Sequence, residues 1–162
     1  MERLRAYYHD RGVAPDTFDA VVARRPSRPL DFDRRVRAVE AFRELPEAEA
    51  LAGANKRIHN ILRKAGDEVP EAYDRDALVE PQERALAERV EALAAEVEPL
   101  LAEGAYEAGL RTLAGLREAV DNFFDGVMVM AEDATVRRNR LGLLRRLSDL
   151  FLATADLSRL QG

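Results

Sequence analysis

The sequence contains no cysteine and only two histidines, His9 and His59. Without cysteine the chain can form no disulfide, thiolate nucleophile or thiolate metal site. Two imidazoles fall short of the three or four ligands of a typical zinc site. The sequence also lacks a phosphate-binding glycine loop, a nucleophile elbow and a Ser/His/Asp arrangement. We therefore expect no metal, no cofactor and no catalytic residue in this chain.

Long apolar runs are also absent. No stretch approaches the roughly 18 apolar residues that a membrane helix needs, and the first residues interleave charged with apolar side chains instead of forming a secretory signal. The composition, 47% hydrophobic and 34% charged over 162 residues, is typical of one soluble domain. We expect a single domain over residues 1–162, located in the cytoplasm and without a membrane partner.

The net charge of −5 is distributed unevenly. Residues 21–65 carry a net charge of +5 and residues 134–162 carry +4, whereas residues 66–133 carry −13. Nucleic acid responds to local potential rather than to net charge. The two basic segments therefore predict one binding face, on the condition that the fold brings them together.

Apolar residues recur at spacings of three and four along nearly the whole chain, which indicates an all-α fold. We predict a bundle of six to seven helices, with residues 1–20 as a leading helical region and residues 21–162 as the main bundle. The predicted helices span about 2–10, 15–23, 31–45, 47–65, 81–103, 106–125 and 133–155. Asp31 and Asp133 are the predicted N-caps of two of them, and Pro99 is expected to kink or split another.

Two connections have distinct predicted characters. Residues 67–77 show no periodicity, so we expect a long, mobile loop there. The stretch from Phe123 to Met130 reads FFDGVMVM. We interpret Phe123, Phe124, Val127 and Met128 as core residues, because large apolar groups favour burial.

Three stretches together resemble the C-terminal region of the β subunit of bacterial two-subunit glycyl-tRNA synthetases. They are ARRPSRPLDFDRRVRAVEAF (residues 23–42), ANKRIHNILRK (54–64) and the segment that begins with FFDGVMVM (123–161). The second and third are also similar to the wider DALR anticodon-binding family of arginyl- and cysteinyl-tRNA synthetases. The proline-rich first stretch favours the glycyl enzyme.

This resemblance implies a helical anticodon-binding domain, with Met1 lying inside a longer protein. The whole enzyme would join glycine to its tRNA using ATP and Mg²⁺, with its catalytic site on a separate α subunit. The implied partners are the tRNA for glycine, the α subunit and the remaining β-subunit domains. The chain itself would contribute to a ligase without catalysing the reaction.

Three groups of polar residues are the candidate tRNA contacts. Arginines can bind phosphates from the proline-rich loop and the following helix, basic residues recur along the 47–65 helix, and a basic cluster containing an amide begins the last helix. In order, the groups are Arg24, Arg25, Arg28, Arg34 and Arg37; Lys56, Arg57, Arg63 and Lys64; and Arg137, Arg138, Asn139 and Arg140. The alternative for each group is a solvated face or pairing with the protein's own carboxylates.

Tyr73 is the candidate for base stacking, because unstacked bases often rest on aromatic rings and this tyrosine lies in the predicted loop. The many carboxylates of residues 67–133 form no ligand-like cluster, and we interpret them as solvated. A second hypothesis for the chain is a helical docking module, whose acidic 81–118 surface contacts other parts of a synthetase. The DALR domain of an arginyl- or cysteinyl-type enzyme is a further alternative.

Overall fold

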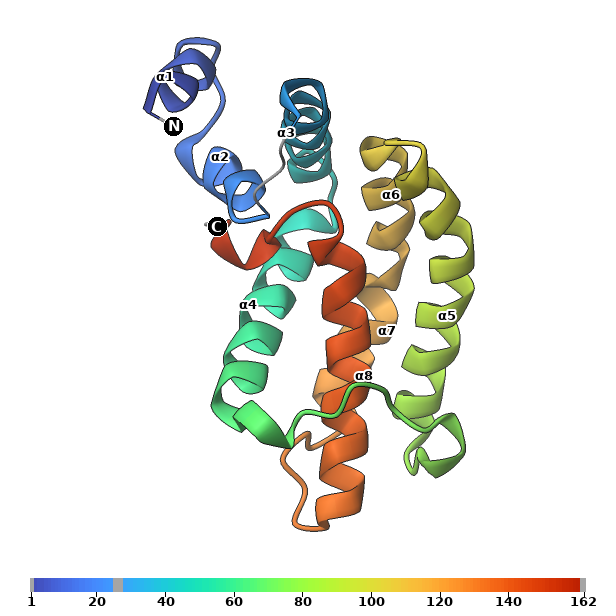
Figure 1. The fold of residues 1–162 in the computed structure, drawn as a ribbon. Helices are drawn as coiled ribbons and strands as arrows, with labels where there is room; N and C mark the ends of the chain where they lie inside the picture. The colour runs from blue at the N-terminus through green and yellow to red at the C-terminus, as the bar shows by residue number, and fades with distance from the viewer. Residues whose placement is uncertain (1, 25–27, 161–162) are drawn as a thin grey trace.

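The computed structural model describes residues 2–24 and 28–160. Within these ranges the chain forms eight α-helices, four short 3-10 helices and no strand (Figure 1). The α-helices are α1 (Glu2–Asp10), α2 (Pro15–Val22), α3 (Pro29–Arg43), α4 (Ala48–Ala65), α5 (Pro81–Ala102), α6 (Tyr106–Leu113), α7 (Arg117–Gly126) and α8 (Ala134–Leu152). The 3-10 helices are η1 (Gly66–Glu68), η2 (Arg75–Ala77), η3 (Ala114–Leu116) and η4 (Leu157–Arg159). The all-α prediction is confirmed.

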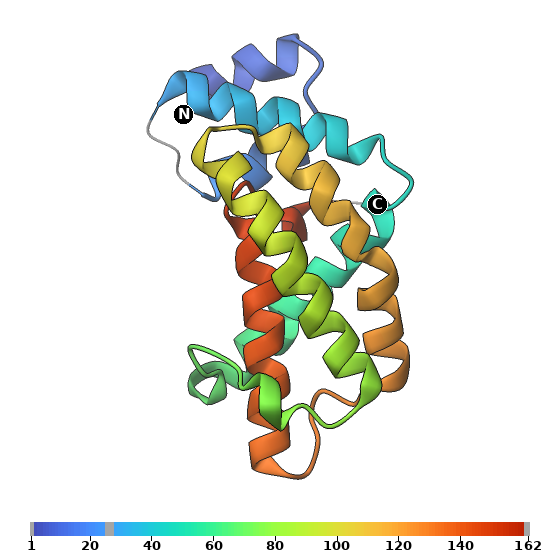
Figure 2. The ribbon, with the colours of Figure 1, turned by 90° about the vertical axis from the view of Figure 1, so that its right-hand side faces the viewer.

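Helix α8 runs along the bundle between α4 and α5, and α6 and α7 pack against α5 (Figures 1 and 2). Helices α1, α2 and α3 gather at one end, where α3 packs against α6 and α2. At the opposite end lie the last turn of α4, the 66–80 connection, the 127–133 connection and the first turns of α8. We call this opposite end the distal end.

The core follows the predicted periodicity. Helix α8 contributes a broad apolar stripe, which packs against fully buried side chains from α3, α4, α5 and α7. The largest fully buried side chains include Phe42, Leu51, Ile58, Leu86 and Phe123, and from α8 itself Leu143 and Phe151. Burial of each such side chain stabilises the fold by roughly 1.5–3 kcal/mol before entropy costs are subtracted.

One N-cap prediction is confirmed and the other is wrong. The Asp133 carboxylate accepts hydrogen bonds from the backbone amides of Thr135 (2.8 Å) and Val136 (3.2 Å), as expected of an N-cap. Helix α3 instead begins at Pro29, because the fixed φ of proline suits the first turn of a helix. Asp31 lies inside that first turn, where its carboxylate binds Arg35 at 2.7 Å.

Two further helix predictions differ from the structure. The predicted helix over 106–125 is divided into α6 and α7 by η3, which explains why eight helices replace the predicted six to seven across the described chain. Pro99 neither splits nor ends α5, which continues to Ala102. Because Pro99 lies so near the end of the helix, its missing amide removes a single bond from the final turns.

The 127–130 segment is only half buried. Val127 and Val129 belong to the core, whereas Met128 is 73% exposed and Met130 is 50% exposed. The prediction that Met128 is a core residue is therefore wrong. The backbone is extended at Val127 (φ −125°, ψ 128°), and successive side chains of an extended segment point to opposite sides. Phe123 is buried as predicted, and Phe124 is partly buried beside it.

In the part of the chain that the structure describes, no helix is both long and apolar enough to cross a bilayer.

Candidate nucleic-acid interface

The fold separates the basic segment 21–65 into two parts. Helix α3, with Arg34 and Arg37, lies at the end opposite the distal end (Figure 1). The 18 residues of α4 then carry the chain about 27 Å along the bundle, at 1.5 Å per residue. The last turn of α4, which contains Arg63 and Lys64, therefore lies at the same end of the bundle as the start of α8, far from α3. The expectation of one surface formed by both whole basic segments is wrong, and only the α4 and α8 parts come together.

The basic face of α4 is open to solvent. Arg57, Arg63 and Lys64 are exposed and Lys56 is partly exposed. Lys56, Arg63 and Lys64 have no ion-pair partner among residues 2–24 and 28–160. Arg63 and Lys64 lie in the last turn of α4, where the negative end of the helix dipole stabilises cations. The guanidinium of Arg57 lies over the ring of Phe124, with Cζ 4.2 Å from the ring centroid, so the ring covers one of its two faces.

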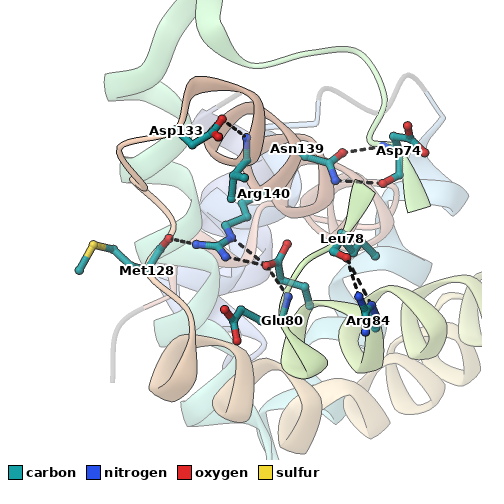
Figure 3. A network of polar contacts seen from close by, with 10 residues as sticks. Asp74, Leu78, Glu80, Arg84, Met128, Asp133, Asn139 and Arg140 are labelled. Carbon is teal, nitrogen blue, oxygen red and sulfur yellow. Dashed lines mark hydrogen bonds and ion pairs between the residues drawn. The ribbon is translucent and has the colours of Figure 1, made fainter. Parts of the chain in front are cut away.

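The first turns of α8 use most of their polar groups inside the protein (Figure 3). Arg140 is buried, and its Nη2 and Nε lie 2.7 Å and 2.9 Å from Glu83 Oε1. Its Nη1 donates to the carbonyl oxygen of Met128 at 2.5 Å. Arg137 pairs with the carboxylate of Glu68 and donates to the carbonyl oxygen of Ala131 at 2.9 Å.

Asn139 is buried as well. Its amide nitrogen donates to the carbonyl oxygen of Asp74 at 2.9 Å, and its amide oxygen accepts from the Asp74 backbone amide at 2.6 Å. The prediction that Arg137, Asn139 and Arg140 face RNA is corrected, because each of them already binds groups of the protein. Arg138, on the outer side of the same helix, is exposed and forms no ion pair in the described chain.

Tyr73 is also engaged. Its hydroxyl donates to Glu91 Oε2 at 2.6 Å, and Glu91 in turn binds Arg146 Nη2 at 3.1 Å. Burial raises the pKa of Tyr73, and the bond to Glu91 raises it further. Burial alone would raise the pKa of Glu91, but hydrogen bonds from Arg146 and Tyr73 and the Arg146 charge hold it below its usual range. A half-buried ring with a committed hydroxyl is poorly placed to stack on a base, so Tyr73 is not retained as a stacking candidate.

The 66–80 connection is held against α8 between Glu68 and Asp74. Besides Tyr73 and the Asp74–Asn139 pair, the carbonyl oxygen of Pro70 accepts from Arg145 Nη1 at 3.2 Å. The connection also approaches α8 closely at Gly142, where an added Cβ would lie 3.0 Å from Pro70 Cγ and 3.2 Å from the Ala72 carbonyl oxygen. The prediction of a free, mobile loop is therefore not supported by its contacts.

The remaining candidates lie at the α3 end. Arg24, Arg28 and Arg34 are exposed, and Arg28 and Arg34 line a hollow of about 310 Å³ beside Gly104 and Tyr106. Arg37 is paired with Asp33 (3.7 Å) and Glu40 (3.1 Å). Arg25 lies outside the described residues.

A groove that no sequence pattern indicated lies between α4 and α8. Its volume is about 380 Å³, and its lining includes His59, Arg63, Val69, Arg145 and Asp149. The polar rim includes the cations Arg63 and Arg145 and a single carboxylate, Asp149. No group of three His, Cys, Asp or Glu residues in the described ranges is placed to hold a metal ion. The two cations in its lining allow the groove to attract anions.

A family model for the DALR anticodon binding domain matches residues 51–157. The chain belongs to the DALR anticodon-binding domain family. The matched range contains Lys56, Arg63, Lys64 and Arg138, whereas Arg24 to Arg37 precede it. Within this DALR domain, the exposed cations of the distal end therefore belong to the part that defines the family.

Three curated relatives match 99% of the chain. The glycine–tRNA ligase beta subunits of Mannheimia succiniciproducens, Marinobacter nauticus and Haemophilus influenzae (strain KW20) are 57%, 56% and 58% identical to it over 161 residues. The chain spans 23% of the length of each of these relatives.

Proposed function

We propose that this DALR domain binds the anticodon region of the tRNA for glycine, as part of a glycine–tRNA ligase beta subunit. The domain holds the tRNA while ATP-dependent aminoacylation, with its Mg²⁺, takes place elsewhere in the enzyme. The α subunit and the remaining beta-subunit domains are the proposed protein partners, and the cytoplasm, where tRNA is charged, is the proposed location. The names of the relatives favour glycine over the arginyl and cysteinyl alternatives.

The observation that carries this proposal is a set of exposed cations without carboxylate partners at the distal end. Arg63 and Lys64 end α4, and Arg138 lies near the start of the neighbouring α8. Their charges are not neutralised within the described protein and remain available to phosphates. The net negative charge of the chain comes from residues 66–133, many of whose carboxylates lie on α5, α6 and α7. The 66–80 and 127–133 connections at the same end also expose carboxylates. The proposal therefore rests on the individual cations, which have no carboxylate within ion-pair distance in the described residues, and not on the charge of the whole end.

The test compares the two ends of the bundle. The variant Arg63→Gln/Lys64→Gln/Arg138→Gln removes three distal charges, and Arg28→Gln/Arg34→Gln is the matched control at the α3 end. We expect the distal variant to bind glycine tRNA about 10- to 100-fold more weakly at fixed low salt, as measured by filter binding. The α3-end variant should bind within about twofold of the unaltered chain.

The same variants distinguish binding from chemistry in the complete ligase. The distal variant should raise the KM for tRNA and leave ATP- and glycine-dependent activation unchanged, because the chain contributes no catalytic group. Equal affinity for glycine tRNA and an unrelated acidic polymer would refute specific recognition. A loss of affinity confined to the α3-end variant would move the RNA surface to that end.

A docking function is the second candidate, and the acidic helices favour it. Helices α5 and α6 and the turn between them expose Glu88, Glu96, Glu103 and Glu107, and a basic partner surface would fit them. Sedimentation of the chain with and without the other synthetase parts tests this function. Replacing these four glutamates with glutamine should weaken assembly while tRNA affinity is kept or increased.

A further inference from the structure

An open hollow of about 590 Å³ lies between α1 and the first turns of α3, at the end of the bundle opposite the distal end (Figures 1 and 2). We call it the α1–α3 groove. Its lining is mainly apolar and includes Leu4, Tyr7 and Leu30. Tyr7 is 46% exposed and Leu30 is 64% exposed. Large apolar side chains that share one hollow form a continuous patch, and such a patch indicates contact with another surface.

The walls of this groove are held in place by Tyr8, which neighbours Tyr7 on α1. The Tyr8 ring is buried, and its centroid lies 5.9 Å from that of Phe18 and 5.4 Å from that of Phe32. Its hydroxyl donates to Asp33 Oδ1 of α3 at 3.0 Å. These contacts fix α1 against α2 and α3 while the adjacent Tyr7 stays exposed. A groove with preformed walls loses little entropy when it binds a partner.

Helix α1 is covered on one side only. It has nine residues, and isolated helices of this length are marginal in water, so its stability depends on packing. Within the described chain it packs chiefly on α2, and Tyr8 connects it to α3. Figure 1 shows α1 at the outer edge of the molecule. A surface placed over the α1–α3 groove would cover Tyr7 and give this short helix a second packing partner.

The charged groups of the groove do not select a polyanion. Its lining contains one cation, Arg3, and one carboxylate, Asp33, which sum to no net charge. Arg5, also on α1, is paired with Asp19 of α2 at 2.8 Å. Arg37 of α3 is paired with Asp33 at 3.7 Å. An apolar protein surface therefore fits the groove better than a phosphate backbone does.

The groove lies outside the part of the chain that defines the DALR family. Its lining residues fall between positions 3 and 33, whereas the family model matches residues 51–157. The glycine–tRNA ligase beta subunits match 161 residues of the chain, so their match includes the groove. The chain spans 23% of their length, which leaves about three quarters of each relative outside the match. The groove thus belongs to what the chain shares with these beta subunits beyond the DALR match.

Resting on the proposed function, we propose that the α1–α3 groove receives an apolar segment from the remaining domains of the same beta subunit. Stable complexes between separate chains bury about 1,200–2,000 Å². Tyr7, about half exposed, offers roughly 100 Å² of the 150–250 Å² that an aromatic side chain can bury. One groove is too small for such a complex. A tethered domain binds at a high effective concentration and needs less area, which favours the same chain over a second copy or the α subunit.

Photo-cross-linking in the complete ligase identifies the occupant. A photoreactive phenylalanine derivative in place of Leu30 should link to a peptide from another domain of the beta subunit. Because that link is within one chain, the denatured product should keep the mass of a single beta subunit. The same derivative in place of Val79, which is 49% exposed elsewhere, controls for non-specific capture. No link, or a link only to the α subunit, to a second beta subunit or to tRNA drawn by the nearby exposed Arg28 and Arg34, would overturn the assignment.

Hydrogen exchange tests the packing on α1. The amides of α1 should exchange about tenfold more slowly in the complete beta subunit than in the 162-residue chain. Tyr7→Ser/Leu30→Ser should remove most of this ratio, and Tyr7→Phe/Leu30→Met should retain it. Met128→Ser/Met130→Ser, at exposed sites of the distal end, is the matched control and should leave the ratio unchanged. Equal exchange in the two unaltered proteins, or an undiminished ratio in the groove serine variant, would refute the docking.

Binding of tRNA separates this inference from the proposed function. The groove lies at the end opposite Arg63, Lys64 and Arg138, so Tyr7→Ser/Leu30→Ser should bind glycine tRNA within about twofold of the unaltered chain. If the unaltered chain binds no glycine tRNA, the proposed function fails, while the cross-link still decides the occupant of the groove. If the chain binds tRNA and no cross-link to the beta subunit forms, only the docking is refuted.

Discussion

Arg140 of α8 and Glu83 of α5 form an ion pair across the interior of the bundle, with Nη2 and Oε1 2.7 Å apart and side-chain exposures of 7% and 1%. Glu83 Oε1 also accepts a hydrogen bond from the backbone amide of Glu80. This one oxygen therefore takes part in capping the N-terminus of α5 and also binds Arg140 of α8. The third guanidinium nitrogen reaches the backbone of the 127–133 connection. One buried pair therefore joins three segments of the distal end.

Removing one partner of this pair should be costly. Arg140→Met leaves the Glu83 carboxylate buried without a counter-charge, so we expect the free energy of unfolding to fall by about 3–5 kcal/mol. Urea denaturation measures this change. The double variant Arg140→Met/Glu83→Leu should recover most of the loss, and Arg138→Met, at an exposed site, should change stability by less than about 0.5 kcal/mol. A single variant as stable as the control would contradict the structural role of the pair.

Two glycines in helices should respond to alanine in opposite ways. At Gly142 an added Cβ meets Pro70, Tyr73 and the Ala72 carbonyl at 3.0–3.2 Å, so Gly142→Ala should destabilise the domain by about 1–3 kcal/mol. At Gly53, on the open face of α4, nothing lies within 4 Å, and alanine should stabilise by about 0.5–1 kcal/mol through helix propensity. Thermal unfolding compares the two variants. The same sign at both positions would show that the 66–80 connection does not pack on α8 as described.

Some of these structural features could be predicted from the sequence and others could not. Apolar spacing correctly indicated the helices, and the local capping geometry of Asp133 was predictable because it involves only the next three residues. The ion-pair partner of Arg140 was not predictable, because Glu83 lies 57 positions away on another helix. Likewise, periodicity alone could not separate α6 from α7, since η3 keeps its apolar residues Ala114 and Leu116 in the core.

The candidate site was predictable in part, for a related reason. A spacing of about two helical turns placed most of Lys56, Arg57, Arg63 and Lys64 on one side of α4, and the structure keeps Arg57, Arg63 and Lys64 exposed. Whether a cation at the start of α8 faces solvent or a carboxylate depends on tertiary packing, which distinguishes Arg138 from Arg137. The outward direction of Met128 depends on an extended segment between two helices, which composition does not reveal.

The half-buried carboxylate of Glu91 should make stability depend on acid pH. Its pKa is held below its ordinary value of 4.5 in the folded protein, so its contribution is present above pH 4.5 and is lost as the pH falls through the folded pKa. Glu91→Gln should therefore be about 1–3 kcal/mol less stable than the unaltered chain at pH 7. Denaturant titrations at pH 7, 4 and 3 should show this difference shrinking steadily. A difference that stayed constant with pH would mean that the ionised form gives no added stability.

The amide of Asn139 should control local rather than global opening. Asn139→Ala removes both hydrogen bonds to the Asp74 backbone, and we expect faster amide hydrogen exchange across residues 70–80. The protection free energy of the core amides of α8 beyond Gly142 should fall by no more than the free energy of global unfolding does, about 1–3 kcal/mol. Asn60→Ala, on the exposed face of α4, is the matched control and should leave exchange in the connection unchanged. Uniform acceleration over the whole chain would indicate that the connection unfolds only with the domain.

Single charges at the distal end should be countable through the salt dependence of tRNA binding. Each phosphate contact contributes about 0.7–0.9 to the slope of log K against log salt, because a bound cation releases condensed counterions. Arg138→Gln should lower the slope by about that amount, and so should Lys64→Gln, since neither side chain has an ion-pair partner in the described protein. Arg37→Gln is a suitable comparison, because Arg37 is already paired with Asp33 and Glu40 at the other end, and its slope should not change. Titrations between about 50 and 200 mM salt measure these slopes, and the two distal losses should add in the double variant if the sites bind separate phosphates. If Arg138→Gln and Lys64→Gln left the slope intact while Arg37→Gln lowered it, the phosphates would have to approach α3 instead of the distal end.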